Sequence, residues 1–177
     1  IEAIATARLQ IPLQLQIVGD ASAHFQSAAQ QIGLNAVEFT GRVSYRDSVR
    51  HICQAGILIL VGNKSPYQIP GKTFLYLASG RPLLYIYQMA ERDDPTWQLL
   101  RQFAGVRYAP NEPSALREFF TQLTDEAFRA WEHQAREHPN LPELTRYEQA
   151  SLVQPLSEAF SRLTRKELCS SSVSRFS

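Results

Sequence analysis

The segment Gln68–Leu84, with the sequence QIPGKTFLYLASGRPLL, restricts the fold of this chain more than any other part. Before it lies GILILV at 56–61, a short apolar run typical of a strand that is covered on both faces. A loop of turn-forming residues follows, and a helix is expected over 72–79, with Gly80 suited to the left-handed conformation that ends a helix. A proline two residues later prevents further helix, so residues 83–87 are predicted to form the next buried strand.

The start of this helix is a candidate anion site. The first backbone N–H groups of a helix have no partners within the helix, and together with the helix dipole they favour negative charge. Lys72 lies beside them and would add a cation. The alternative is that Lys72 is an ordinary solvated lysine, which the helix dipole opposes by only roughly 0.3 kcal/mol.

The first 110 residues repeat the same alternation of strand and helix. Ser44 and Asp94 are suited to cap two of the helices, because their side-chain oxygens accept hydrogen bonds from N–H groups at a helix start. The alternation predicts an α/β fold, with a Rossmann-like parallel sheet and helices on both faces. Ligands of such sheets bind beyond the carboxyl ends of the strands. The strands are predicted at 13–18, 36–40, 57–61, 83–87 and 106–109, and the helices at 21–32, 44–54, 72–79 and 94–103.

The composition limits the classes of function. At 177 residues and 44% hydrophobic content, the chain is long enough for one domain, or for one domain plus an appendage. A net charge of +1 without a basic stripe argues against binding to nucleic acid. The apolar runs are much shorter than the roughly 20 residues of a membrane helix. Cys53 and Cys169 lie in no paired motif, and Cys53 is expected to be a small buried residue. The chain begins at Ile1, inside an expected helix, which suggests a piece of a longer protein.

The C-terminal third has a different, helical character. Amphipathic patterns predict helices over 112–123 and 124–137, and a long helix over 145–163 follows a break that contains two prolines. We expect a Rossmann-like domain over 1–123, helices over 124–165 that pack on it or towards a missing N-terminal domain, and a disordered serine-rich tail over 166–177.

Several blocks of the sequence, in order, resemble the C-terminal half of glycosyltransferases of the GT-B fold, and most of all glycosyltransferase family 4. The blocks are LQLQIVGDAS, GLNAVEFTGRVS, ILILVGN, IPGKTFLYLASGRPLL, VRYAP and RYEQASLVQPLSEAF, which together span roughly residues 10–165. The pattern PGK-x-F-x-Y-L-A-S-G-x-P is fairly specific to bacterial members that build polysaccharides. In that family two Rossmann-like domains face each other across a cleft. The C-terminal one binds a nucleotide-sugar donor, and the N-terminal one, missing here, binds the acceptor.

The resemblance implies roles in donor binding for particular positions. The helix start would meet the donor diphosphate through backbone N–H groups and a lysine ammonium, and the loop after the second strand would lie along the base. These residues are Gly71, Lys72 and Thr73 for the diphosphate, and Gly41, Arg42 and Val43 for the base. Gly19 and Asp20 match a loop near the cleft. The alternatives are that Arg42 is an ordinary surface arginine and that Asp20 caps the helix after it.

The sequence departs from the family in one respect that concerns the ribose. Many members carry two glutamates eight positions apart around this helix, one near the sugar and one on the ribose hydroxyls. The corresponding positions here are Tyr67 and Leu75, and neither side chain is a carboxylate. Tyr76 offers a hydroxyl one position later, although it points about 100° away from Leu75 on a helix.

These observations predict the donor-binding half of a glycosyltransferase, which transfers a sugar from a UDP- or GDP-sugar to a glycan or a lipid-linked acceptor. The departing diphosphate would be stabilised electrostatically by the helix start and Lys72. The resemblance implies no cofactor or metal and action in the cytoplasm, with some members peripherally attached to the inner face of the membrane. The alternatives are a non-catalytic scaffold or regulatory domain, favoured by Leu75, and a sugar-nucleotide epimerase of the same fold.

Overall fold

A computed structural model describes residues 2–21, 26–27, 29–30 and 37–137. Every described residue belongs to one compact unit, Ile1–Pro139. The predicted helix over 145–163 and the predicted tail over 166–177 therefore lie outside the described residues. The same holds for most of the helix predicted over 21–32.

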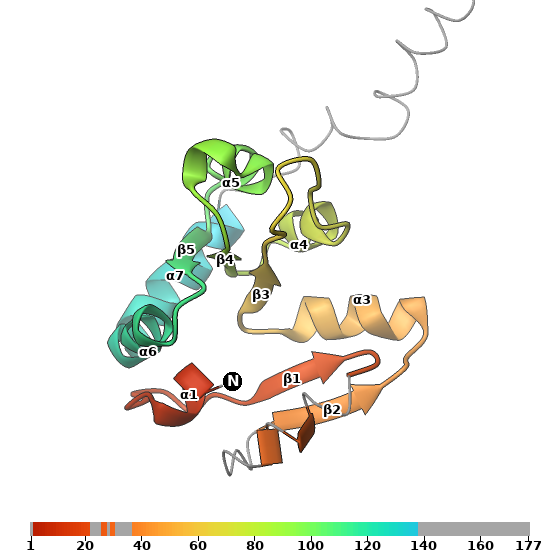
Figure 1. Ribbon diagram of the computed structural model, residues 1–177. Coiled ribbons are helices and arrows are strands. Elements are labelled where there is room, and N and C mark those ends of the chain that lie inside the picture. The colour runs from red at the N-terminus through yellow and green to blue at the C-terminus, as the bar shows by residue number, and fades with distance from the viewer. Residues whose placement is uncertain (1, 22–25, 28, 31–36, 138–177) are drawn as a thin grey trace, which may run out of the picture. The chain divides into compact units, whose positions relative to one another are not determined.

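Strands and helices alternate along the described chain as predicted (Figure 1). The strands are β1 Leu15–Val18, β2 Val37–Gly41, β3 Leu58–Val61, β4 Leu83–Tyr87 and β5 Val106–Pro110. The helices are α1 Glu2–Thr6, α3 Tyr45–Gln54, α4 Thr73–Ala78, α5 Pro95–Leu100, α6 Pro113–Gln122 and α7 Asp125–Glu137, with a turn of 3-10 helix, η1, at Glu91–Asp93.

The strands pair in parallel, but they are divided between two sheets. β1 pairs with β2, while β3, β4 and β5 form a three-stranded sheet in that order. In the register of the larger sheet, Tyr85 of β4 lies between Leu60 and Tyr108. The α/β class is thus confirmed, and the architecture is Rossmann-like. The expected single sheet is not found in the described residues, because no ladder joins β1 to β3.

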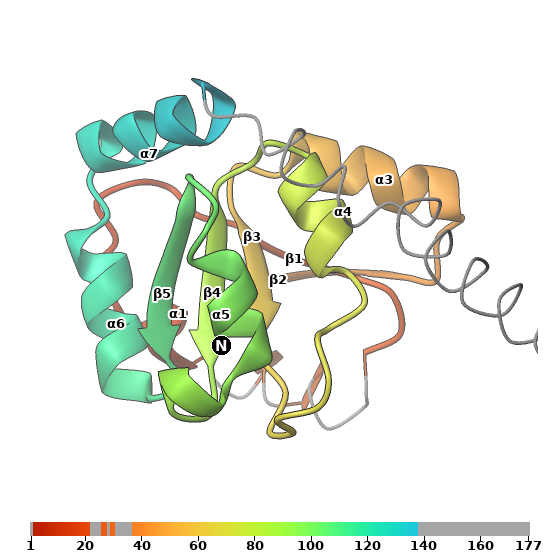
Figure 2. The same cartoon turned by 90° about the horizontal axis from the view of Figure 1, so that it is seen from above.

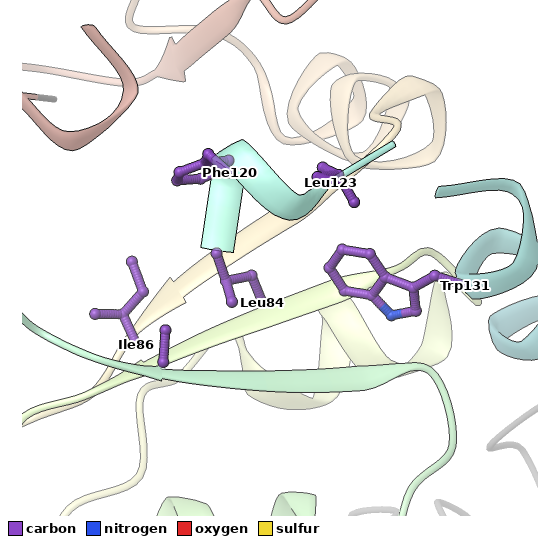
Figure 3. Packing of buried hydrophobic residues seen from close by; sticks show 6 residues of the cluster. Leu84, Ile86, Phe120, Leu123 and Trp131 are labelled. Atoms are coloured by element: carbon purple, nitrogen blue, oxygen red, sulfur yellow. The ribbon is translucent and has the colours of Figure 1, made fainter. Parts of the chain in front are cut away.

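One face of the larger sheet carries the apolar core beneath α6 and α7. Leu84 and Ile86 of β4 point to the same face, since successive side chains of a strand alternate. They pack with Phe120, Leu123 and Trp131 (Figure 3). Trp131 is fully buried, and its indole N–H donates to the carbonyl of Gly105 at 2.8 Å. Truncating a buried tryptophan to alanine typically costs about 3–5 kcal/mol, so α7 is firmly part of this unit.

The other face of the sheet lies beneath α4 and α5 (Figures 1 and 2). Tyr85, which points away from Leu84, donates a hydrogen bond from its hydroxyl to Asp94 at the start of α5. Tyr87, on the same side, contacts the ring of Trp97 edge-on, with ring centroids 4.9 Å apart. Helices therefore cover both faces of the three-stranded sheet, as the sequence predicts.

The predicted helix ends are present where they depend on local residues. The Ser44 hydroxyl accepts the N–H of Asp47 at 3.1 Å, and the Asp94 carboxylate accepts two N–H groups at the start of α5. Gly80 has a φ of 64°, the left-handed conformation expected after α4. α5 ends at Leu100 rather than at Phe103, because the last turn tightens into hydrogen bonds between residues three apart.

The prediction that Cys53 is buried is wrong, because its side chain is exposed. α3 presents Ile52 to the interior, with 7% of its surface exposed. The following residue on a helix points about 100° further round, which takes Cys53 towards solvent. Val49, on the same helix, is half-buried.

Candidate functional site

The turn before α4 presents a cation and two backbone N–H groups. Lys72 is the N-cap residue of α4, and its side chain is exposed; among the residues that the structure describes, no side chain caps this helix. Within the described residues, the backbone N–H groups of Gly71 and Lys72 have no acceptor, and the Lys72 ammonium has no ion-pair partner. These groups are the kind that bind an anion.

Thr73, the third predicted diphosphate residue, closes this turn instead of presenting donors. Its backbone N–H and its hydroxyl both donate to the carbonyl of Pro70, at 3.0 and 2.7 Å. The side chain is fully buried. A contact between Thr73 and a diphosphate would require this turn to open.

The part of the chain that contains this turn has a net positive charge, because it lacks acidic side chains. Between Asp47 and Glu91 the sequence has no carboxylate side chain. Two of the four Lys and Arg residues in this stretch are paired: the Arg50 guanidinium lies 2.8 Å from Asp47, and that of Arg81 lies 3.7 Å from Glu132. The two lysines, at 64 and 72, are exposed and have no ion-pair partner in the described part of the chain. The loop between β3 and α4 is therefore a basic surface.

A cavity of about 590 Å³ borders α4, and two of the predicted site residues, Lys72 and Tyr76, are among the residues that line it. They are four positions apart, so they share one face of the helix. Ser48 and His51 of α3 also line this cavity, and most of its remaining lining is apolar. Burial raises the pKa of Tyr76 above its ordinary value, so its hydroxyl is a neutral donor at physiological pH.

The predicted base-binding loop lies at the end of β2 and contacts the end of β1. The N–H of Gly19 donates to the carbonyl of Gly41 at 3.0 Å, and Arg42 pairs with Asp20 at 2.6 Å. Both charged side chains are largely exposed, so this ion pair contributes little stability. Gly41, Arg42 and the half-buried Val43 do not line the cavity beside α4, and their contact with a base stays a prediction.

A chain of side-chain amides at the carboxyl ends of the three-stranded sheet was not predicted. The side-chain amide of Gln88 donates to the carbonyl of Gly62, and that of Asn111 donates to the side-chain oxygen of Gln88 at 3.2 Å. Gln88 directly follows β4, and Asn111 directly follows β5. The signal in the sequence is a carboxamide just beyond a buried strand, at the edge where ligands of such sheets bind.

A buried hydroxyl, that of Tyr85, lies beneath the start of the loop between β3 and α4. The Tyr85 hydroxyl is 2.7 Å from the Asp94 carboxylate, and both residues are almost completely buried. Burial, and then this hydrogen bond, raise the pKa of Tyr85 well above its ordinary value. A Cβ placed on Gly62 would lie 2.9 Å from Cζ of Tyr85 and closer still to its oxygen. The loop backbone therefore passes directly over this hydroxyl.

The fold and this geometry define a Rossmann-like α/β domain with a basic loop beyond the carboxyl end of β3. Comparison with models of protein families and with curated proteins gives no match to this sequence. Within the described residues, no cluster of His, Cys, Asp and Glu could hold a metal ion. No helix among them has both the length and the apolar content needed to cross a bilayer.

Proposed function

We propose that this chain is the donor-binding half of a glycosyltransferase, which transfers a sugar from a UDP- or GDP-sugar to a glycan or a lipid-linked acceptor. The observation that carries the proposal is the turn before α4, where Lys72 and the N–H groups of Gly71 and Lys72 have no partner in the described residues. The parallel sheet beneath it supports the proposal, because ligands of such sheets bind at this edge. The resemblance of the PGK block to family 4 adds the nature of the ligand.

The chemistry follows from where charge develops. Cleavage of the bond between sugar and diphosphate leaves a negative charge on the departing phosphate oxygen. Donors fixed around that oxygen in advance stabilise the transition state without reorganisation. In this proposal the Lys72 ammonium and the two N–H groups supply that stabilisation. Tyr76 would donate its hydroxyl to the ribose from the same cavity, and Gly41, Arg42 and Val43 would lie along the base.

The proposal assigns the acceptor to a separate N-terminal domain of the same protein. It also places the reaction in the cytoplasm, with peripheral contact at the inner face of the membrane where the acceptor is lipid-linked. A catalytic side chain is not assigned, because the described residues offer no carboxylate near Lys72 in the sequence from 48 to 90.

Titration of the isotope-labelled chain with UDP and with GDP tests the proposal. We expect the amide signals of residues 71–73 to move on addition of millimolar nucleotide. Lys72→Ala should weaken binding about tenfold, the size expected for one hydrogen bond to a charged group. Arg101→Ala, at an exposed position after α5, is the matched control and should bind as the wild type does. Unmoved signals at the turn would refute the proposal.

A second candidate is a non-catalytic scaffold or regulatory domain of the same fold. It is favoured by Leu75, which stands in α4 where many family members have a ribose-binding glutamate. The engagement of both Thr73 donors with Pro70 points the same way. A chain that folds normally but binds neither nucleotide would support this candidate.

A further inference from the structure

The first residue of the basic loop 62–71 is fixed from two sides. The N–H of Gly62 donates to the carbonyl of Ile86 at 2.8 Å, which continues the pairing of β3 with β4 beyond the end of the strand. The carbonyl of Gly62 accepts the side-chain amide of Gln88. No other donor to this carbonyl is found in the described residues, so its hydrogen bond depends on Gln88.

The amide of Gln88 is itself held at both ends. Its oxygen accepts the side-chain amide of Asn111 at 3.2 Å, and the backbone N–H of Asn111 donates to the carbonyl of Tyr87 at 2.9 Å. The chain of hydrogen bonds therefore runs from the end of β5, across the end of β4, to the loop that follows β3. Two anchored ends leave Gln88 with fewer alternative rotamers than a free surface glutamine has.

Further hydrogen bonds lie along the loop between its first residue and α4. Within it, the side-chain amide of Asn63 donates to the carbonyl of Gln68 at 3.2 Å. At its far end, the Pro70 carbonyl accepts both donors of Thr73, the first residue of α4. Between Asn63 and Gln68, the backbone N–H of Tyr67 also donates to the hydroxyl of Ser65, at 3.4 Å. Described hydrogen bonds therefore recur along the loop from Gly62 to the turn that contains Lys72.

We propose that Gln88 is a positioning residue for the donor site, which acts by fixing the loop 62–71 through the carbonyl of Gly62. The inference rests on the proposed function, because it deepens the account of the same anion site. Gln88 itself does not contact the diphosphate. Its donor N–H holds the loop, and the loop holds Gly71 and Lys72 in the geometry that an anion needs. Preorganisation of this kind raises affinity by reducing what must be ordered on binding.

Two substitutions of the full 177-residue chain separate this role from simple packing. Gln88→Met keeps the length of the side chain and removes the amide. Gln88→Glu keeps the shape and an acceptor for Asn111, but it turns a carboxylate oxygen towards the carbonyl of Gly62. If Gln88 only fills space, Gln88→Glu should bind UDP almost as well as the wild type does. If Gln88 donates a hydrogen bond to the loop, both variants should bind UDP more weakly, and Gln88→Glu should lose at least as much affinity as Gln88→Met.

The matched control is Gln98→Met, since Gln98 also donates from its side chain to a backbone carbonyl, that of Glu91, on the exposed side of α5. The probe is UDP, and the readouts are its affinity and the amide signals and exchange rates of residues 62–72. We expect about fivefold weaker UDP binding in Gln88→Met, as for one lost hydrogen bond. We also expect faster amide exchange confined to the loop. Gln98→Met should match the wild type in both.

The outcomes distinguish this inference from the proposed function. If the wild type binds UDP and both Gln88 variants bind it equally well, the inference is overturned while the proposed function stands. The inference is also overturned if Gln88→Glu binds as the wild type does and Gln88→Met does not. If the wild type itself binds no UDP, the proposed function fails and this role fails with it. The inference is supported if both Gln88 variants bind UDP more weakly than the wild type and the amide signals of residues 62–72 change.

Discussion

The substitution Gly62→Ala tests how tightly the loop start lies against the buried tyrosine. The new Cβ would come within 2.9 Å of Cζ of Tyr85 and nearer to its hydroxyl oxygen. Tyr85 has no exposed surface, and its hydroxyl is held by Asp94, so the ring cannot move aside without cost. Crowding of this kind costs about 1–3 kcal/mol. Loss of the hydrogen bond to the buried carboxylate would add about 1–3 kcal/mol. We expect a total loss of roughly 3 kcal/mol in the free energy of unfolding.

The other end of the same loop supplies the control. A Cβ on Gly71 meets no atom within 4 Å, and Gly71 does not have a positive φ. Gly71→Ala should therefore change the free energy of unfolding by no more than about 0.5 kcal/mol. Chemical denaturation of both variants measures the difference, and in thermal unfolding it corresponds to roughly 6–12 °C for a chain of this size. If the two variants unfold within 0.5 kcal/mol of each other, about the spread of ordinary surface substitutions, the loop does not lie where the structure has it.

Three further predictions concern other parts of the fold. Burial raises the pKa of Tyr108 from 10.0 to about 12, so the folded chain holds a proton that the unfolded chain releases. The raised pKa of Tyr108 therefore contributes fully to the free energy of unfolding below pH 10. This contribution is lost as the pH rises towards 12, at about 1.4 kcal/mol per pH unit. Tyr108→Phe should make the measured stability fall less steeply in this window. Gly105→Ala should cost roughly 4 kcal/mol, because φ is 74° and the Cβ would lie 2.6 Å from that of Ala135. Gly80→Ala, with a φ of 64° and no such contact, should cost only about 1 kcal/mol in the same denaturation experiment. Ser44→Ala removes the N-cap of α3 and should cost about 1 kcal/mol, whereas equal stability would show that the cap is not formed in solution.

The parts of the fold that the sequence predicted are those decided by neighbouring residues. An N-cap needs an oxygen within three residues of the N–H groups that it accepts, as at Ser44 and Asp94. The cap at Gly80 needs only a residue without a Cβ. The apolar run of β4 needs burial on both faces, which its composition shows directly.

Of the remaining features, the neighbour of β1 and the bond from Gln88 to Gly62 depend on residues far apart in the chain. A strand offers the same backbone groups whatever its sequence, so the pattern of β1 shows its faces but not its neighbour. The burial of Cys53 was predicted wrongly because this residue borders the apolar face of α3. A residue at that border can point either to the core or to solvent. The bond from Gln88 to Gly62 joins residues 26 positions apart, and no local pattern indicates it. The hydrogen bonds from Thr73 to Pro70, by contrast, join residues three positions apart, and they were missed because the resemblance assigned Thr73 to the diphosphate.

The proposed site divides into two parts whose contributions can be told apart. The turn at Gly71 and Lys72 would contact the diphosphate, which is identical in UDP and GDP, so it cannot distinguish the two nucleotides. Any preference between them must come from elsewhere, and the loop of Gly41, Arg42 and Val43 is the proposed source. Because the segment from 48 to 90 contains no carboxylate, the phosphate part is governed by positive charge and should weaken as salt is added. This division predicts that the affinities for UDP and GDP fall together as salt is added. The ratio of the two affinities should then stay the same at every salt concentration. If the ratio changes with salt as strongly as the affinities do, then the base and the diphosphate are not bound by separate parts.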